Sequence, residues 1–141
     1  MNVHRVGEDD DLTPLITAGL EEGFPFLSRL AVEHAQGDFY RDDAVLFGVF
    51  EGAKLLGVGG VTPDPYTPDP SVGRIRHVYV LPEARRRGVA RELLACLVAS
   101  APLQYRRLRL RTLTEGGAAF YRSCGFTETL EPDATHTLTR T

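Results

Sequence analysis

The chain has few cysteines, no long apolar run and no basic leader followed by an apolar stretch. Its 141 residues include only Cys96 and Cys124, which are too few for a disulfide framework or a four-cysteine zinc site. No apolar segment approaches the length of a membrane span, and the opening MNVHRVGEDDDL does not read as a signal peptide. We therefore expect a cytoplasmic protein that needs neither a metal ion nor a membrane.

Positive charge is also scarce over the chain as a whole. The formal net charge is −3 and the isoelectric point is about 5.8, whereas proteins that bind nucleic acid usually carry a strong positive balance. Hydrophobic residues make up 43% and charged residues 25%, as in ordinary globular proteins. The length suits one domain over residues 1–141. We expect no nucleic-acid partner.

Apolar periodicity and the positions of glycine and proline predict the order β-α-α-β-β-β-α-β-α-β-β, a mixed α/β (α+β) fold. The expected strands lie at 2–6, twice within 44–61 around a turn at 51–53, and at 73–81, 107–113, 126–130 and 135–140. The expected helices end near Glu22, lie within 24–40, run from 90 to a stop at Pro102, and lie within 116–126.

Two segments carry further expectations about exposure. The stretch 62–73 contains four prolines, which cannot sit inside a paired strand, so we expect an exposed loop. RLRLRTL at 107–113 alternates leucine with arginine, which is typical of a strand with one buried face and one polar face.

An arginine cluster precedes the third expected helix. Arg85, Arg86 and Arg87 stand before Gly88, and each cation in a first helical turn costs roughly 0.3–1 kcal/mol. A bound anion would remove this cost, because free backbone amides and guanidinium groups together suit a phosphate or diphosphate. A solvated basic turn without a ligand is the alternative. The motifs of Walker P-loops and dinucleotide-binding turns are absent from this helix start.

These residues also resemble a known family. RRRGVA at 85–90 resembles the acetyl-CoA signature Q/R-x-x-G-x-G/A of the GNAT superfamily of N-acetyltransferases. VYVLPEA at 78–84 resembles that family's fourth strand and turn, and AAFYRSCGF at 118–126 resembles its later helix and strand. The resemblance spans roughly residues 44–130. It implies a central, mostly antiparallel sheet whose fourth and fifth strands splay apart.

The resemblance implies an enzyme that moves the acetyl group of acetyl-CoA directly to a primary amine in a ternary complex. It assigns the departing thiolate to Tyr121. It assigns the coenzyme to the following residues, of which the first three would lie along the pantetheine arm and the others around the diphosphate: Val78, Tyr79, Val80, Arg85, Arg86, Arg87, Gly88, Val89 and Ala90.

Two of these implications can be examined further from the residues. A tyrosine with a pKa near ~10 that gives its proton to a thiolate near ~8.5 works uphill by about 2 kcal/mol. Tyr121 therefore needs either a lowered pKa or a role as a hydrogen-bond donor. In the fourth strand, the aliphatic positions Ile75, Val78 and Val80 break period two, and one extra residue near Arg76–His77, a β-bulge, would restore it.

The sequence departs from the family pattern at two positions. Thr114 stands where many members have asparagine, and Arg74 stands where many have a glutamate that acts through water as the base. No base therefore transfers from the resemblance. His77, with an ordinary pKa near ~6.5, remains a candidate beside Glu21, Glu22 and Glu33, and release of the proton to bulk solvent is the alternative.

Three functions stay open at this point. The first is the N-acetyltransferase, the second a GNAT-fold module that binds coenzyme A as a sensor without catalysis, and the third a grip of Arg85–Arg87 on DNA phosphates. The acceptor is equally open, because Phe24, Phe26 and Tyr66 with nearby acids suit many small-molecule or peptide amines. The acyl group could differ from acetyl, and an open strand edge in the final hairpin could support a homodimer.

Overall fold

The computed structural model describes all residues, 1–141. Its helices and strands follow the expected order, with two additional short 3-10 helices, η1 and η2. In chain order the elements are β1 (Asn2–Arg5), α1 (Thr13–Glu21), α2 (Phe26–Ala35), η1 (Asp38–Tyr40), β2 (Val45–Glu51), β3 (Lys54–Pro63), β4 (Val72–Val80), η2 (Pro82–Ala84), α3 (Val89–Ser100), β5 (Arg107–Leu110), α4 (Glu115–Ser123), β6 (Thr127–Glu128) and β7 (His136–Thr139).

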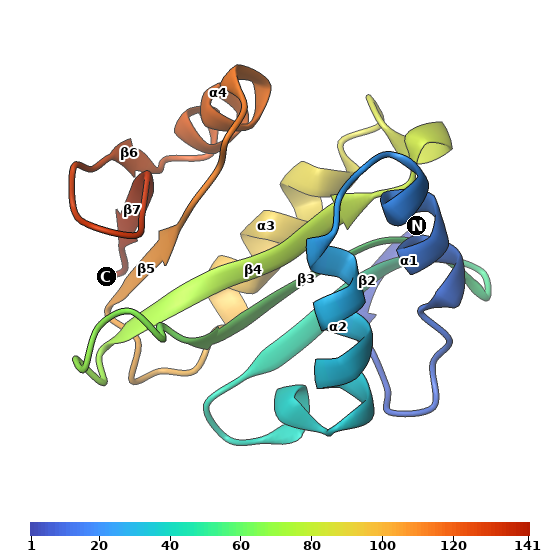
Figure 1. Cartoon of the computed structure of the whole chain (residues 1–141), viewed down its shortest axis with the longest axis horizontal. Coiled ribbons are helices and arrows are strands. Elements are labelled where there is room, and N and C mark those ends of the chain that lie inside the picture. Colours follow the sequence, from blue (N-terminus) through green and yellow to red (C-terminus); the bar gives the residue numbers. More distant parts are fainter.

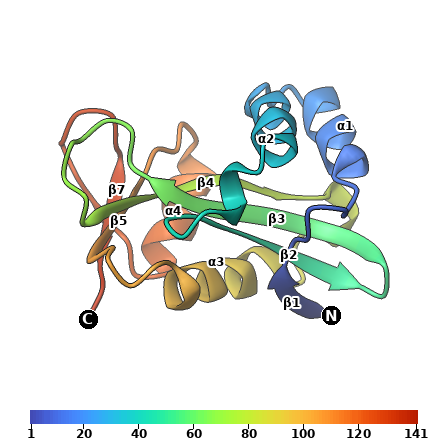
Figure 2. The ribbon, with the colours of Figure 1, turned by 90° about the horizontal axis from the view of Figure 1, so that it is seen from below.

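One sheet of seven strands runs through the molecule in the order β1-β2-β3-β4-β5-β7-β6. Every neighbouring pair is antiparallel except β4 and β5, which are parallel. The helices α1 and α2 cover one face of the sheet and α3 covers the other (Figures 1 and 2). No helix has both the length and the apolarity needed to cross a lipid bilayer. The predicted fold class is thus confirmed.

The helix α3 packs on the sheet through one apolar stripe. Val89, Leu93, Leu94 and Leu97 are buried, and their spacing places them on one side of the helix. On the opposite face of the sheet, Leu27 and Leu30 of α2 are fully buried, as is Leu15 of α1. The core therefore consists of two apolar layers, one on each face of the sheet.

The helix α4 ends at a glycine in the left-handed conformation. Gly125 has φ 96°, a conformation that glycine adopts without strain. Its N–H donates to the Arg122 carbonyl, and the N–H of Phe126 donates to the Tyr121 carbonyl. These are the two bonds of a Schellman motif, and the buried Phe126 supplies its apolar contact.

The expected exposed loop at 62–73 is wrong at its ends, because Thr62 and Pro63 belong to β3 and Val72 belongs to β4. The expected exposure is also wrong at Asp64 and at Arg109 of β5. Asp64 has a fully buried side chain, and Arg109 is 4% exposed. The Asp64 carboxylate accepts hydrogen bonds from Arg109 Nε at 2.9 Å and Arg74 Nη1 at 3.2 Å. Sequence alternation cannot reveal this, because the loop that supplies the buried carboxylate is remote from β5 in the chain.

Candidate functional site

The strand β4 contains the predicted bulge. Val58 of β3 pairs with Tyr79, whereas Gly60 pairs with Arg76, so Gly59 faces two residues of β4. His77 is one of the two, and its φ of 60° is uncommon for a residue other than glycine. The expectation of an extra residue near Arg76–His77 is confirmed. Bulges of this kind often lie beside functional sites.

Beyond its first residues, β4 has no partner on the β5 side. The parallel pairing joins Val72, Gly73 and Arg74 to β5 and stops there, although β4 continues to Val80. The two strands then diverge toward α4 and η2 (Figure 1). The upper part of β4 thus presents backbone groups that an extended ligand can pair with, in the manner of an added strand.

The segment that opens α3 carries unpaired backbone donors. None of the N–H groups of Arg86 through Arg91 donates to an acceptor of the chain, whereas Glu92 N–H donates to the Gly88 carbonyl. Arg86 has φ 64° and Gly88 has φ 77°, and alternating left-handed residues turn successive N–H groups toward a common side. The segment is therefore suited to hold a diphosphate, even without its side chains.

Two of the three arginines of this segment already have carboxylate partners. Arg85 makes a two-pronged ion pair with Glu22, at 2.6 and 2.9 Å. Arg87 binds Glu51 at 2.7 Å. Arg86 alone is exposed without a hydrogen bond or ion pair. The premise that all three cations lack an anion is therefore wrong, because Glu22 after α1 and Glu51 at the end of β2 supply carboxylates that lie far away in sequence.

Glu22, which follows α1, is joined to Tyr79 of β4 and to Arg85 by hydrogen bonds. Its carboxylate accepts hydrogen bonds from Arg85 and from the Tyr79 hydroxyl, and these donors lower the pKa of Glu22. Arg85 Nε also donates to the Val80 carbonyl at 3.1 Å. Burial, with the carboxylate beside it, raises the pKa of Tyr79 to about 12. At neutral pH the Tyr79 phenol therefore keeps its proton, and Glu22 and Arg85 form an ion pair.

Tyr121 lies on α4, on the far side of the strand divergence from the body of β4 (Figure 1). Its ring packs edge-on against Phe120 and Phe126, with centroids 5.2 and 5.7 Å away. The hydroxyl donates to no acceptor of the chain. Burial raises the pKa of Tyr121 to about 12, so the alternative of a lowered pKa is wrong. The phenol keeps its proton at neutral pH and is a free hydrogen-bond donor.

Two of the four candidates for a base, His77 and Glu33, lie together between α2 and the bulge. His77 Nε2 is 3.3 Å from Glu33 Oε2, and Glu33 also binds Arg76 at 2.6 Å. Burial, reinforced by Arg76, lowers the pKa of His77 to about 4. An imidazole that weak removes a proton poorly from an alkylammonium group near ~10.4. Glu21 and Glu22 fare no better, since Glu21 is exposed without a polar contact and Glu22 is paired.

Arg74, at the position of the family's glutamate, is bound by a buried carboxylate and a backbone carbonyl. It donates to Asp64 and to the Asp133 carbonyl, the latter at 2.7 Å, and its guanidinium lies 4.7 Å from the centre of the Tyr66 ring. Thr114, where many family members have asparagine, caps α4 by accepting from Gly117 N–H at 3.0 Å. Both departures from the pattern therefore have structural roles.

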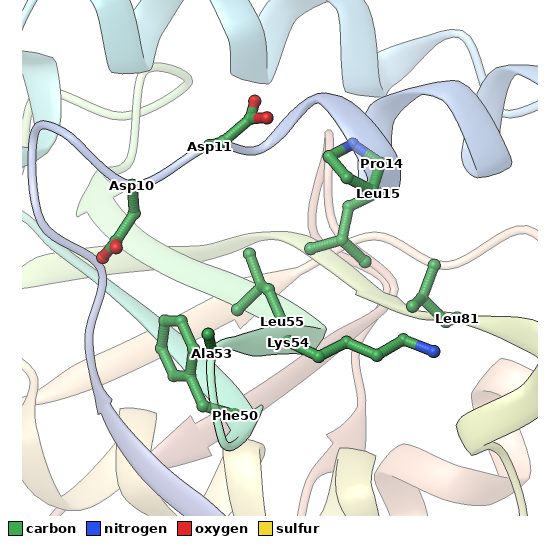
Figure 3. A pocket seen from close by; sticks show the side chains of 9 residues that line it. All are labelled: Asp10, Asp11, Pro14, Leu15, Phe50, Ala53, Lys54, Leu55 and Leu81. Carbon is green, nitrogen blue, oxygen red and sulfur yellow. The ribbon is translucent and has the colours of Figure 1, made fainter.

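Two cavities of the protein lie mainly outside this region. One of about 240 Å³ lies between the start of α1 and the β2–β3 turn (Figure 3). Its charged groups are Asp10, Asp11 and Lys54, and no predicted site residue lines it. A second, of about 440 Å³, lies between α3 and the C-terminal segment and includes Arg91 and Cys124. Arg91 lines the second cavity, whereas no residue of 86–90 lines either one.

Sequence comparison defines the family. Residues 42–128 match the model of the acetyltransferase (GNAT) domain. A candidate acetyltransferase from Exiguobacterium sp. 255-15 is 32% identical, with a TM-score of 0.85 over 98% of this chain and 92% of that one. The chain belongs to the GNAT acetyltransferase family. No protein of curated function has a significantly similar sequence.

More distant structures share the fold. The ribosomal-protein-alanine N-acetyltransferase of Brucella melitensis is 19% identical, with a TM-score of 0.76 over 99% of both chains. A candidate acetyltransferase of Clostridium acetobutylicum, whose structure contains acetyl-CoA, is also 19% identical, with a TM-score of 0.69 over 92% of both chains. At such identities the likeness concerns the fold alone.

Proposed function

We propose that this chain is an acetyl-CoA-dependent N-acetyltransferase that acts on a primary amine by direct transfer in a ternary complex. The observation that carries the proposal is the row of unpaired amides from Arg86 to Arg91, placed beside the unpartnered part of β4. This pair of features fits a ligand with a diphosphate and an extended, amide-bearing arm. Acetyl-CoA supplies an activated acetyl thioester.

Different residues of the site would bind the diphosphate, orient the pantetheine arm and stabilise the departing sulfur. The amides of Arg86–Arg91, with Gly88, Val89 and Ala90 among them, would bind the diphosphate, helped by the free guanidinium of Arg86 and the paired Arg85 and Arg87. The backbone of Val78, Tyr79 and Val80 would orient the arm, with the Val80 carbonyl shared with Arg85. Tyr121 would donate its hydrogen bond to the departing sulfur.

The chemical balance follows from these roles. The thioester C–S bond breaks, the amide C–N bond forms, and an ammonium acceptor loses two protons in all. One proton ends on the thiol of coenzyme A and the other passes to solvent. We propose this solvent route because His77 is too weak a base and Arg74 replaces the glutamate. Tyr121 stabilises charge on the sulfur without giving up its proton, since that transfer would be uphill by about 5 kcal/mol.

A sensor that binds coenzyme A without turnover is the second candidate, and the missing base favours it. Titration calorimetry with acetyl-CoA in dilute buffer, followed by measurement of thiol release across a panel of amines, separates the two. Heat together with thiol release supports the transferase, and heat alone supports the sensor. The absence of heat would overturn both.

Charge reversal tests the site within the same experiment. Arg86→Glu should weaken acetyl-CoA binding by about tenfold or more, since it replaces a free cation beside the amides by an anion. Arg106→Glu is the matched control, because Arg106 is an exposed arginine outside this segment. Equal losses in the two variants would point to overall charge instead of a site. A grip on DNA is disfavoured, since Glu22 and Glu51 neutralise Arg85 and Arg87.

The proposal treats residues 1–141 as one transferase domain. It places the reaction in the cytoplasm, with a small-molecule or peptide amine as acceptor and with no nucleic acid, membrane or metal ion involved. The edge strand β6 has only two residues, which leaves room for a homodimer through the final hairpin.

A further inference from the structure

Two neighbouring phenylalanines are exposed, Phe24 on the α1–α2 connection and Phe26 at the start of α2. Phe24 is 37% and Phe26 is 40% exposed, and neither belongs to the hydrophobic core. Their ring centroids lie 5.9 Å apart, so they form one apolar surface. Exposed aromatic side chains that gather in this way usually mark a binding site.

This surface faces the bulged part of β4. The Phe26 ring stacks over His77 with centroids 6.2 Å apart, and the Phe24 ring stands edge-on to Tyr79 at 6.0 Å. From Val80 back to His77, the strand covers about 10 Å at roughly 3.3 Å per residue. A pantetheine arm that starts at the α3 N-terminus would therefore bring its reactive end to the bulge, beside the two rings.

The paired carboxylates that contact β4 beside this surface disfavour one class of acceptor. The carboxylates that contact β4 here are Glu22, closed by Arg85 and the Tyr79 hydroxyl, and Glu33, closed by Arg76 and His77. Because each carboxylate is already paired with an arginine, neither attracts an ammonium group of the acceptor strongly. A polyamine or an aminoglycoside would bring several cations to a place that offers aromatic carbon and closed ion pairs.

We propose that the acceptor is a monoamine carried on an aromatic or similarly apolar group, which lies against Phe24 and Phe26 while the amine points to the β4 bulge. This inference rests on the proposed transferase function. It names the class of acceptor and identifies the two phenylalanines as the residues that determine specificity.

The first test compares amines on the wild-type protein. The probes are 2-phenylethylamine, ethylamine and spermidine, measured by kcat/KM for thiol release and by ligand-observed NMR on the protein saturated with coenzyme A. We expect 2-phenylethylamine to exceed ethylamine by about tenfold or more in both readouts, the size expected for one good aromatic contact. A preference for spermidine, or equal response to all three, would overturn the proposal.

The second test removes the rings. Phe24→Ala and Phe26→Ala should each lower kcat/KM for 2-phenylethylamine several-fold and weaken its NMR binding, with little change for ethylamine and in coenzyme A affinity. Leu103→Ala is the control, since Leu103 is 92% exposed on the α3–β5 connection. Unchanged selectivity in both variants would contradict the inference. If no amine is acetylated yet 2-phenylethylamine binds and the variants lose it, the transferase proposal fails while the apolar amine site stands.

Discussion

The sequence locates His77 correctly at the β-bulge, but it does not reveal the burial that makes His77 a poor base. Its sequence position beside a break in strand periodicity locates the bulge, and the ordinary pKa of histidine makes it a candidate base. Burial beside Phe26 and Phe39, reinforced by Arg76, then lowers its pKa to about 4. The low pKa makes His77 a poor base and gives it a measurable effect on stability.

The folded state should lose stability in mild acid because of His77. Its folded pKa of about 4 lies below the ordinary 6.5, so the unfolded chain binds more protons between these values. The contribution is full above pH 6.5, is lost as the pH falls toward 4, and amounts to about 3 kcal/mol. Urea unfolding followed by circular dichroism at pH 7.5, 5.5 and 4.5 measures it.

His77→Asn is the matched variant for this measurement, because asparagine tolerates the positive φ and does not titrate. Its free energy of unfolding should depend less on pH over this range than that of the wild type. The same pH dependence in both proteins would show that other groups cause the acid loss.

The hydroxyl of Tyr121 can be tested separately, because a single substitution removes it. Tyr121→Phe removes a donor that has no partner within the chain and keeps a ring that packs against Phe120 and Phe126. We expect kcat to fall by about a hundredfold, the lower range for a group that assists a leaving atom, with stability and coenzyme A affinity nearly unchanged. Stopped-flow thiol release and calorimetry provide the two readouts. A parallel loss of affinity would indicate that Tyr121 serves binding instead.

At the level of elements, local signals in the sequence predict well and remote pairings do not. The apolar stripe of α3, the Gly125 ending of α4 and the bulge in β4 each follow from residues close together in the chain. The carboxylates on Arg85, Arg87 and Arg109 come from Glu22, Glu51 and Asp64, which only the folded sheet brings near. Charge in a segment therefore indicates where ions gather, but the fold decides which anion neutralises them.

Asp64 makes the consequence of such a remote pairing testable. It joins the β3–β4 connection to β4 and β5 by accepting from Arg74 and Arg109, and Arg109 Nη2 is already buried without a partner. Asp64→Asn would leave two buried cations short of negative charge, which should lower the free energy of unfolding by about 3–5 kcal/mol. Asp42→Asn, at an exposed position without hydrogen bonds, should change it little. Similar midpoints of urea unfolding in both variants would contradict the account.

The whole molecule consists of a continuous sheet with unequal support at its two ends. The N-terminal strands lie under α1, α2 and α3, whereas α4 has no fully buried residue. Beyond Arg74, β4 gives β5 no further pairing. The final segment is tied to the rest through the start of β4, through hydrogen bonds from Arg140 to the α3–β5 connection, and through apolar packing. One direct link across the divergence is the hydrogen bond from Arg91 to Ser123 Oγ, at 2.8 Å.

This asymmetry predicts where the coenzyme acts on stability. Local opening is easiest where few apolar groups are buried, so the amides of α4 should exchange hydrogen faster than those of α3 in the free protein. A ligand that contacts both the amides of Arg86–Arg91 and Tyr121 binds only while α4 is folded in place. At a hundredfold excess over its Kd it stabilises that state by about 2.7 kcal/mol. Saturating coenzyme A should therefore slow exchange in α4 strongly while β1 and β2 change little, as measured by peptide-resolved hydrogen–deuterium exchange. Protection confined to the start of α3, with α4 unaffected, would mean that the diphosphate binds without bridging the two halves, and Tyr121 would then lie outside the coenzyme site.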